Sequence, residues 1–286
     1  MPPGPRAALG NEDFFYMMKT LTKFILSSLL LTSLSGLGLA KPMPHVPADH
    51  FVVPEGFEVT LWASSPLFYN PTNMDVDAEG RIWVAEGRNY RMYRNESKGF
   101  SAETKGDRIM VLTDSNGDGK ADKSHVFVQD PELIAPLGVA VIDNQVVVSQ
   151  PPNLLVYTDV NRDAVFDPKV DKKEALLTGF GGQDHDHSLH AVTTGPSGQW
   201  YFNAGNAGSH IVTDNDGWTL RVGSVYKGGA PSVTDEGPNQ GGKPGLKSDD
   251  GHIYVGAVAL RMNPDGTGLR PIGHNMRNSY EETVNS

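Results

Sequence analysis

The sequence predicts an all-β protein, and among all-β folds it favours a β-propeller. No window after residue 40 keeps the 3.6-residue apolar period of an amphipathic helix. Glycine and proline, at 32 and 20 residues, are spread along the chain, which suits short strands joined by tight turns. One hairpin unit also occurs three times, and such internal repetition is typical of propeller blades.

The repeated unit is a short strand, a turn containing Gly or Asn, and a second apolar or aromatic strand. Its three copies pair residues 73–76 with 81–85, 138–141 with 145–149, and 190–193 with 199–203. Further strands are expected at 57–62, 108–113, 124–128, 154–158 and 255–262. The copies recur at roughly the length of one four-stranded blade with inserted loops. We therefore expect about four blades of a propeller, and because a propeller must close to remove its sheet edges, we expect this chain to be a C-terminally truncated fragment. A β-sandwich is the alternative, although its strands would not recur as a matched unit.

The N-terminal region predicts an exported protein. Residues 18–40 read as a signal peptide, with Lys19 and Lys23 before an uncharged apolar stretch that ends in small residues at Ala40. Cleavage near Ala40 would deliver residues 41–286, a partial propeller domain, to the periplasm or the extracellular space. A transmembrane anchor is the alternative, but the stretch is short and is interrupted by serine and glycine. Residues 1–17 are expected to result from a start codon assigned too early.

Composition narrows the range of partners. The formal net charge is −10, which argues against a nucleic-acid partner, because phosphate binding needs basic patches. The chain has no cysteine, so it contains no CxxCH site for covalent haem c. Residues 228–252 are rich in Gly, Pro, Asp and Lys and are expected to form a long surface loop.

Two acidic loops follow predicted strands and match each other position by position. Both place oxygen-bearing side chains at loop positions 1, 3, 5 and 9, the spacing with which a loop wraps around calcium. The flanking strands and the absence of Glu at position 12 exclude an EF-hand. The simpler interpretation is that Asp, Asn and Gly form good turns. The candidate ligands are Asp114, Asn116, Asp118 and Asp122 in the first loop, and Asp159, Asn161, Asp163 and Asp167 in the second.

A histidine cluster at 185–190 is the densest polar constellation in the chain. One hypothesis is catalytic: an imidazole acts as general base and is oriented by a carboxylate such as Asp186. A second is a transition-metal site, because the HxHxxH spacing can supply three nitrogen ligands. A third is a polar loop whose histidines satisfy local backbone groups. The candidate catalytic residues are His187, His190 and Asp186.

Five segments resemble the soluble quinoprotein glucose/sorbosone dehydrogenase-like propellers. The resemblance is greatest to the membrane-bound dehydrogenase-like branch, whose longer members often carry a C-terminal haem-binding CxxCH module. These segments are PEGFEVTLWAS at 54–64, RIWVAEGRNYR at 81–91, GDRIMVLTDSNGDGKAD at 106–122, DHDHSLHAVTTGPSGQWYFNAGN at 184–206 and GHNMRNSYE at 273–281.

The resemblance implies a full-length propeller of six or more blades that holds pyrroloquinoline quinone (PQQ) and calcium at its channel. It implies that His190 takes the proton of a sugar or alcohol substrate while hydride passes to the quinone. Arg277 and Asn278 would lie against the quinone, and Glu86 and Arg88 would line the channel. A cytochrome c domain would accept the electrons, with haem c present only in a C-terminal module. Two other functions stay open: a calcium-dependent hydrolase such as a lactonase, and a non-catalytic propeller that binds glycans or proteins.

Overall fold

The computed structural model describes residues 46–90, 103–223 and 247–285. The predicted signal peptide, the start of the chain and most of the predicted 228–252 loop lie outside these residues. Almost all of the described part belongs to one compact unit, Ala48–Ser286. Among the described residues, the one helical element is the 3-10 turn η1 (Ala48–His50), and no described helix is long and apolar enough to cross a membrane.

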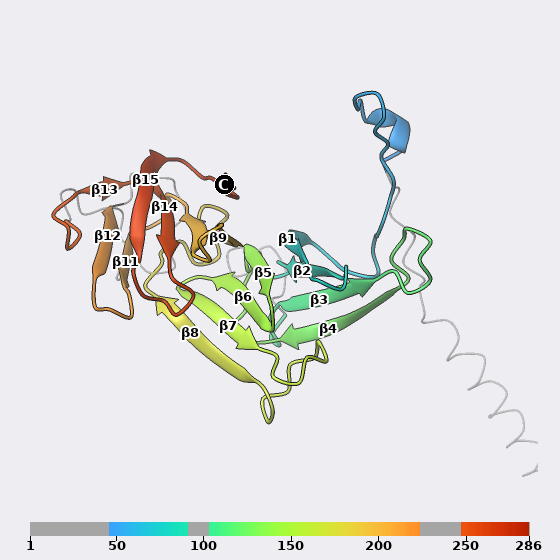
Figure 1. Cartoon of the computed structure of the whole chain (residues 1–286), viewed down its shortest axis with the longest axis horizontal. Helices are drawn as coiled ribbons and strands as arrows, with labels where there is room; N and C mark the ends of the chain where they lie inside the picture. The colour runs from blue at the N-terminus through green and yellow to red at the C-terminus, as the bar shows by residue number, and fades with distance from the viewer. Residues whose placement is uncertain (1–45, 91–102, 224–246, 286) are drawn as a thin grey trace, which may run out of the picture. The chain divides into compact units, whose positions relative to one another are not determined.

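Three of the four sheets in the unit are four-stranded and antiparallel, in agreement with the all-β fold that the sequence predicts (Figure 1). The first sheet joins β1 (Pro71–Val76), β2 (Ile82–Glu86), β3 (Arg108–Thr113) and β4 (Lys123–Gln129) in sequence order. The second joins β5 (Gly138–Ile142), β6 (Gln145–Gln150), β7 (Asn153–Thr158) and β8 (Lys172–Thr178) in the same way. Consecutive up-and-down sheets of four strands are the blades of a β-propeller-like fold.

The third sheet contains an insertion. Its strands are β9 (Leu189–Thr194), β10 (Trp200–Ala204), β14 (Ala257–Met262) and β15 (Arg270–Met276). Between β10 and β14 the chain forms a separate three-stranded sheet of β11 (His210–Thr213), β12 (Thr219–Gly223) and β13 (Tyr254–Val255). About four blades were expected. The described residues form three, and the fourth sheet is this insertion.

The three predicted hairpins are β1–β2, β5–β6 and β9–β10. Gly80 and Gly198 occupy equivalent turn positions at φ +79°, a conformation that side chains with a Cβ rarely adopt. The predicted strand at 57–62 is wrong. Phe57 and Leu61 are exposed there, and the segment pairs with no strand. It meets the first blade through side-chain packing of Trp62 against Val84, Met110 and Leu112 and through the bond from Ala121 N–H to the Trp62 carbonyl.

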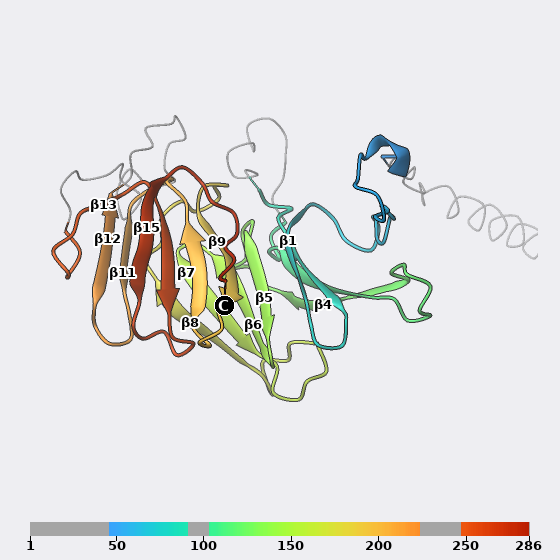
Figure 2. The same ribbon diagram turned by 45° about the horizontal axis from the view of Figure 1, so that its top comes forward.

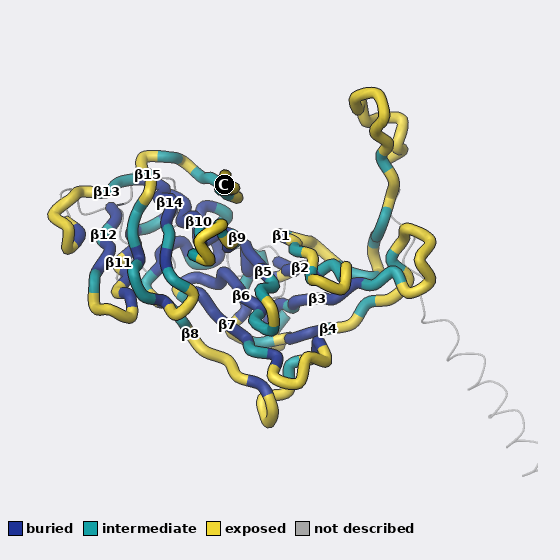
Figure 3. Tube along the Cα trace, viewed as in Figure 1, coloured by how far each residue is buried: buried dark blue, intermediate teal, exposed yellow. Residues whose placement is uncertain are grey.

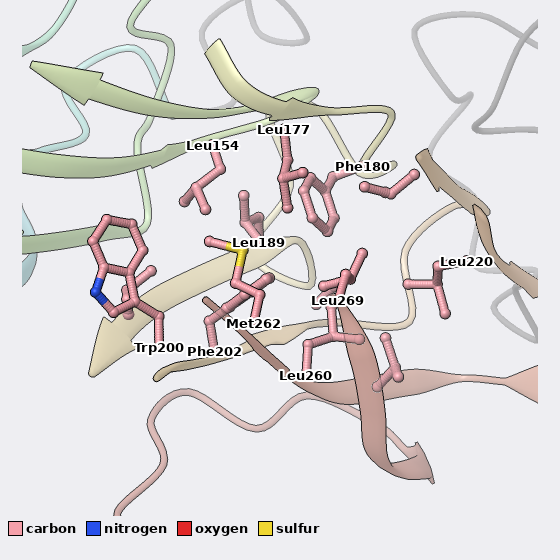
Figure 4. Close-up of a cluster of buried hydrophobic side chains, with 14 of the residues drawn as sticks. Leu154, Leu177, Phe180, Leu189, Trp200, Phe202, Leu220, Leu260, Met262 and Leu269 are labelled. Carbon is pink, nitrogen blue, oxygen red and sulfur yellow. The ribbon is translucent and has the colours of Figure 1, made fainter. Parts of the chain in front are cut away.

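Neighbouring blades are joined by apolar cores. Trp83, Phe127, Val148 and Tyr157 belong to the core between the first and second blades. The larger core joins the second blade, the third blade and the inserted sheet, with Trp200, Phe202 and Leu260 among its buried side chains (Figure 4). Burial concentrates in the inner and middle strands, whereas the outermost strand β8 begins with four exposed residues (Figure 3).

Polar bonds join the innermost strands β1, β5 and β9. The Asn73 Oδ1 and Asp75 Oδ2 atoms of β1 accept the N–H groups of Val139 and Val141 on β5, at 2.9 and 2.7 Å. The Ser149 hydroxyl of β6 donates to the His190 carbonyl of β9 at 2.6 Å. These bonds fix the position of the strand that carries His190.

Candidate functional site

The candidate site forms where the end of the described chain returns to the innermost strands (Figure 2). After β15, residues 277–285 have no regular secondary structure. Asn278 and Tyr280 in this segment contact His190 on β9. Three residues after Asn278, Glu281 accepts a hydrogen bond from Asn73 Nδ2 on β1 at 2.8 Å. The segment therefore bridges the innermost strands of the third and first blades.

His190 is a buried imidazole whose tautomer follows from its partners. Its Nε2 lies 2.6 Å from Asn278 Oδ1. Asn278 Nδ2 donates to the Asp186 carbonyl at 2.9 Å, so the amide oxygen is the atom that faces the imidazole. A carbonyl oxygen only accepts hydrogen bonds, so Nε2 must carry the proton. In the neutral ring the lone pair then lies on Nδ1, which is buried and has no hydrogen-bond partner in the described structure.

Burial keeps His190 neutral. The side chain is 0% exposed, and this burial lowers its pKa below the ordinary value of 6.5, although the bond to Asn278 acts in the opposite direction. The Tyr280 ring covers the imidazole, with 4.3 Å between the ring centroids. At neutral pH the site therefore presents an unprotonated nitrogen base in a dry environment.

The rest of the histidine cluster supports the loop around this base. His187 Nδ1 pairs with Asn206 Oδ1 at 2.7 Å, and the His187 N–H donates to His185 Nδ1 at 2.9 Å. The Asp186 carboxylate lies 3.1 Å from His185 Nδ1, while its carbonyl holds Asn278. Asp186 was the candidate for orienting the catalytic imidazole, but in the structure that position belongs to Asn278.

The transition-metal hypothesis finds no geometric support. Among the described residues, no group of three or more His, Cys, Asp or Glu side chains is arranged to hold a metal ion. His210, outside the HxHxxH segment, is fully buried and links two loops, accepting from Gly181 N–H and donating to the Gly205 carbonyl. Its burial lowers its pKa to about 4, so it is a neutral structural histidine.

The residues that the resemblance places against the quinone and along the channel differ in their position relative to His190. Arg277 lies beside the site: its side chain is exposed, and its carbonyl accepts from Asn206 N–H. Glu86 is fully buried in a two-bond ion pair with Arg108 of β3, at 2.6 and 2.9 Å. Arg88 is exposed and lies over the Tyr69 ring, 5.9 Å from its centroid. Glu86 is therefore occupied by structural contacts, and no contact brings Arg88 to His190.

The two acidic loops share one backbone design. In the first, both Asp114 oxygens accept backbone N–H groups, including that of Gly119. In the second, Asp159 accepts from Asp163 and Ala164 in the same way. Loop position 6 is left-handed in both, at Gly119 (φ +83°) and Ala164 (φ +60°). Ala164 thus adopts the left-handed conformation that a glycine provides at the same position of the first loop.

The loops close through different positions. Asp122 accepts from the Ser115 N–H, the residue after the first loop aspartate, at 2.7 Å. The corresponding N–H in the second loop, that of Val160, is bound at 2.9 Å by Asp171 and not by the predicted Asp167. Sequence reasoning missed Asp171 because the second loop is longer. Within the described residues, neither loop brings three or more of its carboxylates into an arrangement that could hold a metal ion.

Three further site residues were not predicted. Tyr280 lies within the GHNMRNSYE segment, but the sequence did not indicate it as a site residue. Asn203 of β10 is 0% exposed, and neither its Oδ1 nor its Nδ2 has a described partner. Glu282 has an unpartnered Oε2, and burial raises its pKa to about 7. Tyr280 and Glu282 lie in the irregular segment 277–285, whose path strand patterns do not predict, and the burial of Asn203 depends on how its blade packs.

Comparison with known proteins identifies a family without an assigned activity. Residues 43–254 match the family model described as a domain of unknown function, DUF7133. The chain belongs to this family. No curated protein matches the chain.

Among solved structures, a catalytically inactive virginiamycin B lyase from Staphylococcus aureus, determined with quinupristin, is similar at a TM-score of 0.31 and 14% sequence identity. The match covers 73% of this DUF7133 chain and 57% of the lyase chain.

Proposed function

We propose that this chain is part of an exported, dehydrogenase-like enzyme in which His190 acts as a general base on a hydroxyl group of a sugar or alcohol. The observation that carries the proposal is the Nδ1 atom of His190, a buried lone pair without a described partner. Asn278 fixes the tautomer through Nε2. A base held in this way accepts a proton at a defined atom, as general base catalysis requires.

The burial of His190 supports the same chemistry. A lowered pKa keeps the imidazole unprotonated at neutral pH, when a base is needed. Tyr280, which is 43% exposed, lies against the imidazole with 4.3 Å between the ring centroids, so it is a partly exposed neighbour of the base. The proton passes from the hydroxyl oxygen to Nδ1, and Asn278 Oδ1 stabilises the imidazolium through the Nε2 proton.

PQQ fits the described residues poorly. It is a planar, anionic cofactor whose carboxylates call for cationic partners. Arg277 is the cation beside the site, whereas Asp186, Glu281 and Glu282 lie on the same segments. Glu86 is committed to Arg108. We therefore derive no step through PQQ, and we treat quinone binding, calcium binding and transfer of electrons to a cytochrome c domain as separate predictions.

A single assay separates the candidate functions. The full chain is incubated with a panel of sugars and alcohols, with and without PQQ and calcium, and the reduction of an artificial electron acceptor is recorded. Hydrolysis of sugar lactones is recorded in parallel by acid release. We expect acceptor reduction that His190→Gln abolishes and Asn263→Ala, a change in a distant turn, preserves. Turnover that is equal in wild type and His190→Gln would refute the role of His190, and lactone hydrolysis without acceptor reduction would favour the hydrolase.

A further inference from the structure

The first blade has a second apolar face, which points away from the second blade. Trp83 and Ala85 of β2 belong to the core between these two blades, so Val84 between them points to the opposite side. A cavity of about 530 Å³ opens on this side, a volume within the range of roughly 300–1,000 Å³ that small-molecule sites have. Its lining includes Trp62, Phe68, Met74, Val84, Leu112 and Glu281.

Apolar side chains form most of the wall of this cavity. Val84 and Leu112 are almost completely buried, whereas Met74 is 64% exposed and lies at the rim. Trp62 and Phe68 come from the segment before β1, which packs on the sheet without pairing with a strand. A polar molecule would lose its hydrogen bonds to water against such a wall. The ligand that fits this cavity therefore has an apolar body.

Glu281 is the one charged side chain in the lining of this cavity. Its Oε1 accepts the bond from Asn73 Nδ2 at 2.8 Å. Asn73 is buried, and its Oδ1 in turn accepts the Val139 N–H at 2.9 Å, so both ends of the amide are fixed. The carboxylate is thus held in place by a bond to a neutral group. Within the described structure, Glu281 forms no ion pair.

Two further cavities in the described part of the chain differ in this respect. In one, Lys173 pairs with Asp130 at 2.6 Å, and in the other, Arg81 pairs with Asp77 at 2.6 Å. Each of these cavities therefore contains a cation that neutralises a carboxylate. The cavity at Glu281 has no cation in its lining, so the negative charge there is left for a ligand to neutralise.

We infer that this cavity binds an organic ammonium ion with an apolar body. The Oε2 atom of Glu281 accepts an N–H of the ammonium group, and a hydrogen bond between two charged groups is stronger than one between neutral groups. The faces of the Trp62 and Phe68 rings also attract positive charge. The cavity does not include His190, so the inference does not depend on the proposed base.

Three ligands of equal length separate the contribution of charge from that of apolar contact. Calorimetric titrations of the full chain at pH 7 use 4-phenylbutylamine, 4-phenylbutan-1-ol and 4-phenylbutanoate. We expect the amine to bind at least about tenfold more tightly than the alcohol, and the carboxylate to bind more weakly than the alcohol. The amine should also shift the methyl NMR signal of Met74, which Met74→Leu assigns.

Two variants test the role of the carboxylate. Glu281→Gln keeps an oxygen for the Asn73 bond but removes the charge. It should weaken amine binding at least about tenfold and change alcohol binding less than about threefold. Met74→Lys places a competing cation at the exposed rim, so it should abolish amine binding even if Glu281→Gln does not fold. Glu174→Gln, at an exposed position of β8, is the control and should bind all three ligands as wild type does.

Several results would overturn the inference. Equal affinities for the amine and the alcohol would contradict it, and so would amine binding that Glu281→Gln leaves within about twofold of wild type. Amine binding that does not move the Met74 signal would place the ligand elsewhere. No amine binding by wild type would also overturn it. If the chain is then a dimer that Met74→Lys converts to a monomer, this face is an interface between two copies of the chain.

Discussion

Asn278 Oδ1 lies 2.6 Å from His190 Nε2, and the two residues come from segments 88 positions apart in the chain. This contact determines which imidazole nitrogen carries the proton, and so which one is free to act as a base. It also makes the pKa of His190 sensitive to the charge of residue 278.

Replacing Asn278 with Asp should raise the pKa of His190. A carboxylate beside Nε2 stabilises the imidazolium, whereas in wild type burial lowers the pKa below 6.5. Since the neutral form is the base, the variant should lose its free base at a higher pH than wild type does. An NMR titration of the imidazole measures this directly, with Asn263→Asp as a control for the added charge. A His190 pKa in Asn278→Asp equal to or below that of wild type would contradict the assigned contact.

Gly205 should not tolerate a side chain. A Cβ at this position would lie 2.6 Å from Asn278 Oδ1 and even closer to the backbone carbonyl carbon of His187. The backbone cannot yield without moving the loop, so we expect Gly205→Ala to cost about 1–3 kcal/mol in the free energy of unfolding. Denaturant unfolding measures this cost. Gly198→Ala is not a suitable control, because the positive φ of Gly198 would strain an alanine by itself. Ala207→Gly, two residues from Gly205, instead measures how sensitive stability is to any change in this loop. Wild-type stability in Gly205→Ala would show that the loop does not pack as described.

His210 should make stability fall with acid. Its folded pKa is lowered to about 4, and the unfolded value is near 6.5, so the unfolded state binds the proton first as pH decreases. The unfolding free energy that depends on a neutral His210 is fully present above pH 6.5. It decreases by up to about 3 kcal/mol as the pH falls from about 6.5 to about 4. His210→Gln, which can accept and donate similar bonds, should reduce the difference in unfolding free energy between pH 7 and pH 5. An unchanged difference would show that His210 is not a buried neutral group.

Calcium should stabilise the chain if the first acidic loop binds it. Asp118 and Asp122 supply hard oxygen ligands, although Asp122 must then exchange its bonds to Ser115 for the cation. Calcium titration should raise the melting temperature, and Asp118→Ala should remove most of the increase. Asp216→Ala, in another exposed turn, serves as the control. Melting that is indifferent to both calcium and chelator would show that the loops are only turns.

Regular strands were predictable because their signals are local. Arg108–Thr113 was predicted with the observed bounds, since a run of apolar residues flanked by polar ones forms a strand wherever it finds neighbours. The segment at 57–62 alternates apolar and polar residues, which also predicts a strand, but in the structure it pairs with no strand, so the pattern alone was insufficient. Strand formation needs a partner, which a single segment does not specify.

The site was only partly predictable. His190 and Asn278 were both candidates, but their mutual contact depends on the path of residues 277–285. Glu86 was expected at the channel, whereas its pairing with Arg108 arises from the register of β2 and β3. Asn203 follows three aromatic residues in an ordinary strand pattern. Its importance lies in its burial and its unpaired amide, and neither property is encoded locally.

The tautomer of His190 tests the central claim most directly. Nitrogen-15 NMR of the histidine side chains in the full chain at pH 7 distinguishes a protonated from an unprotonated ring nitrogen, with His190→Gln assigning the signals. The structure predicts a neutral His190 with the proton on Nε2 and the lone pair on Nδ1, a state that persists below pH 6.5. A proton on Nδ1, or an imidazolium at pH 7, would contradict the account of His190 as a poised base.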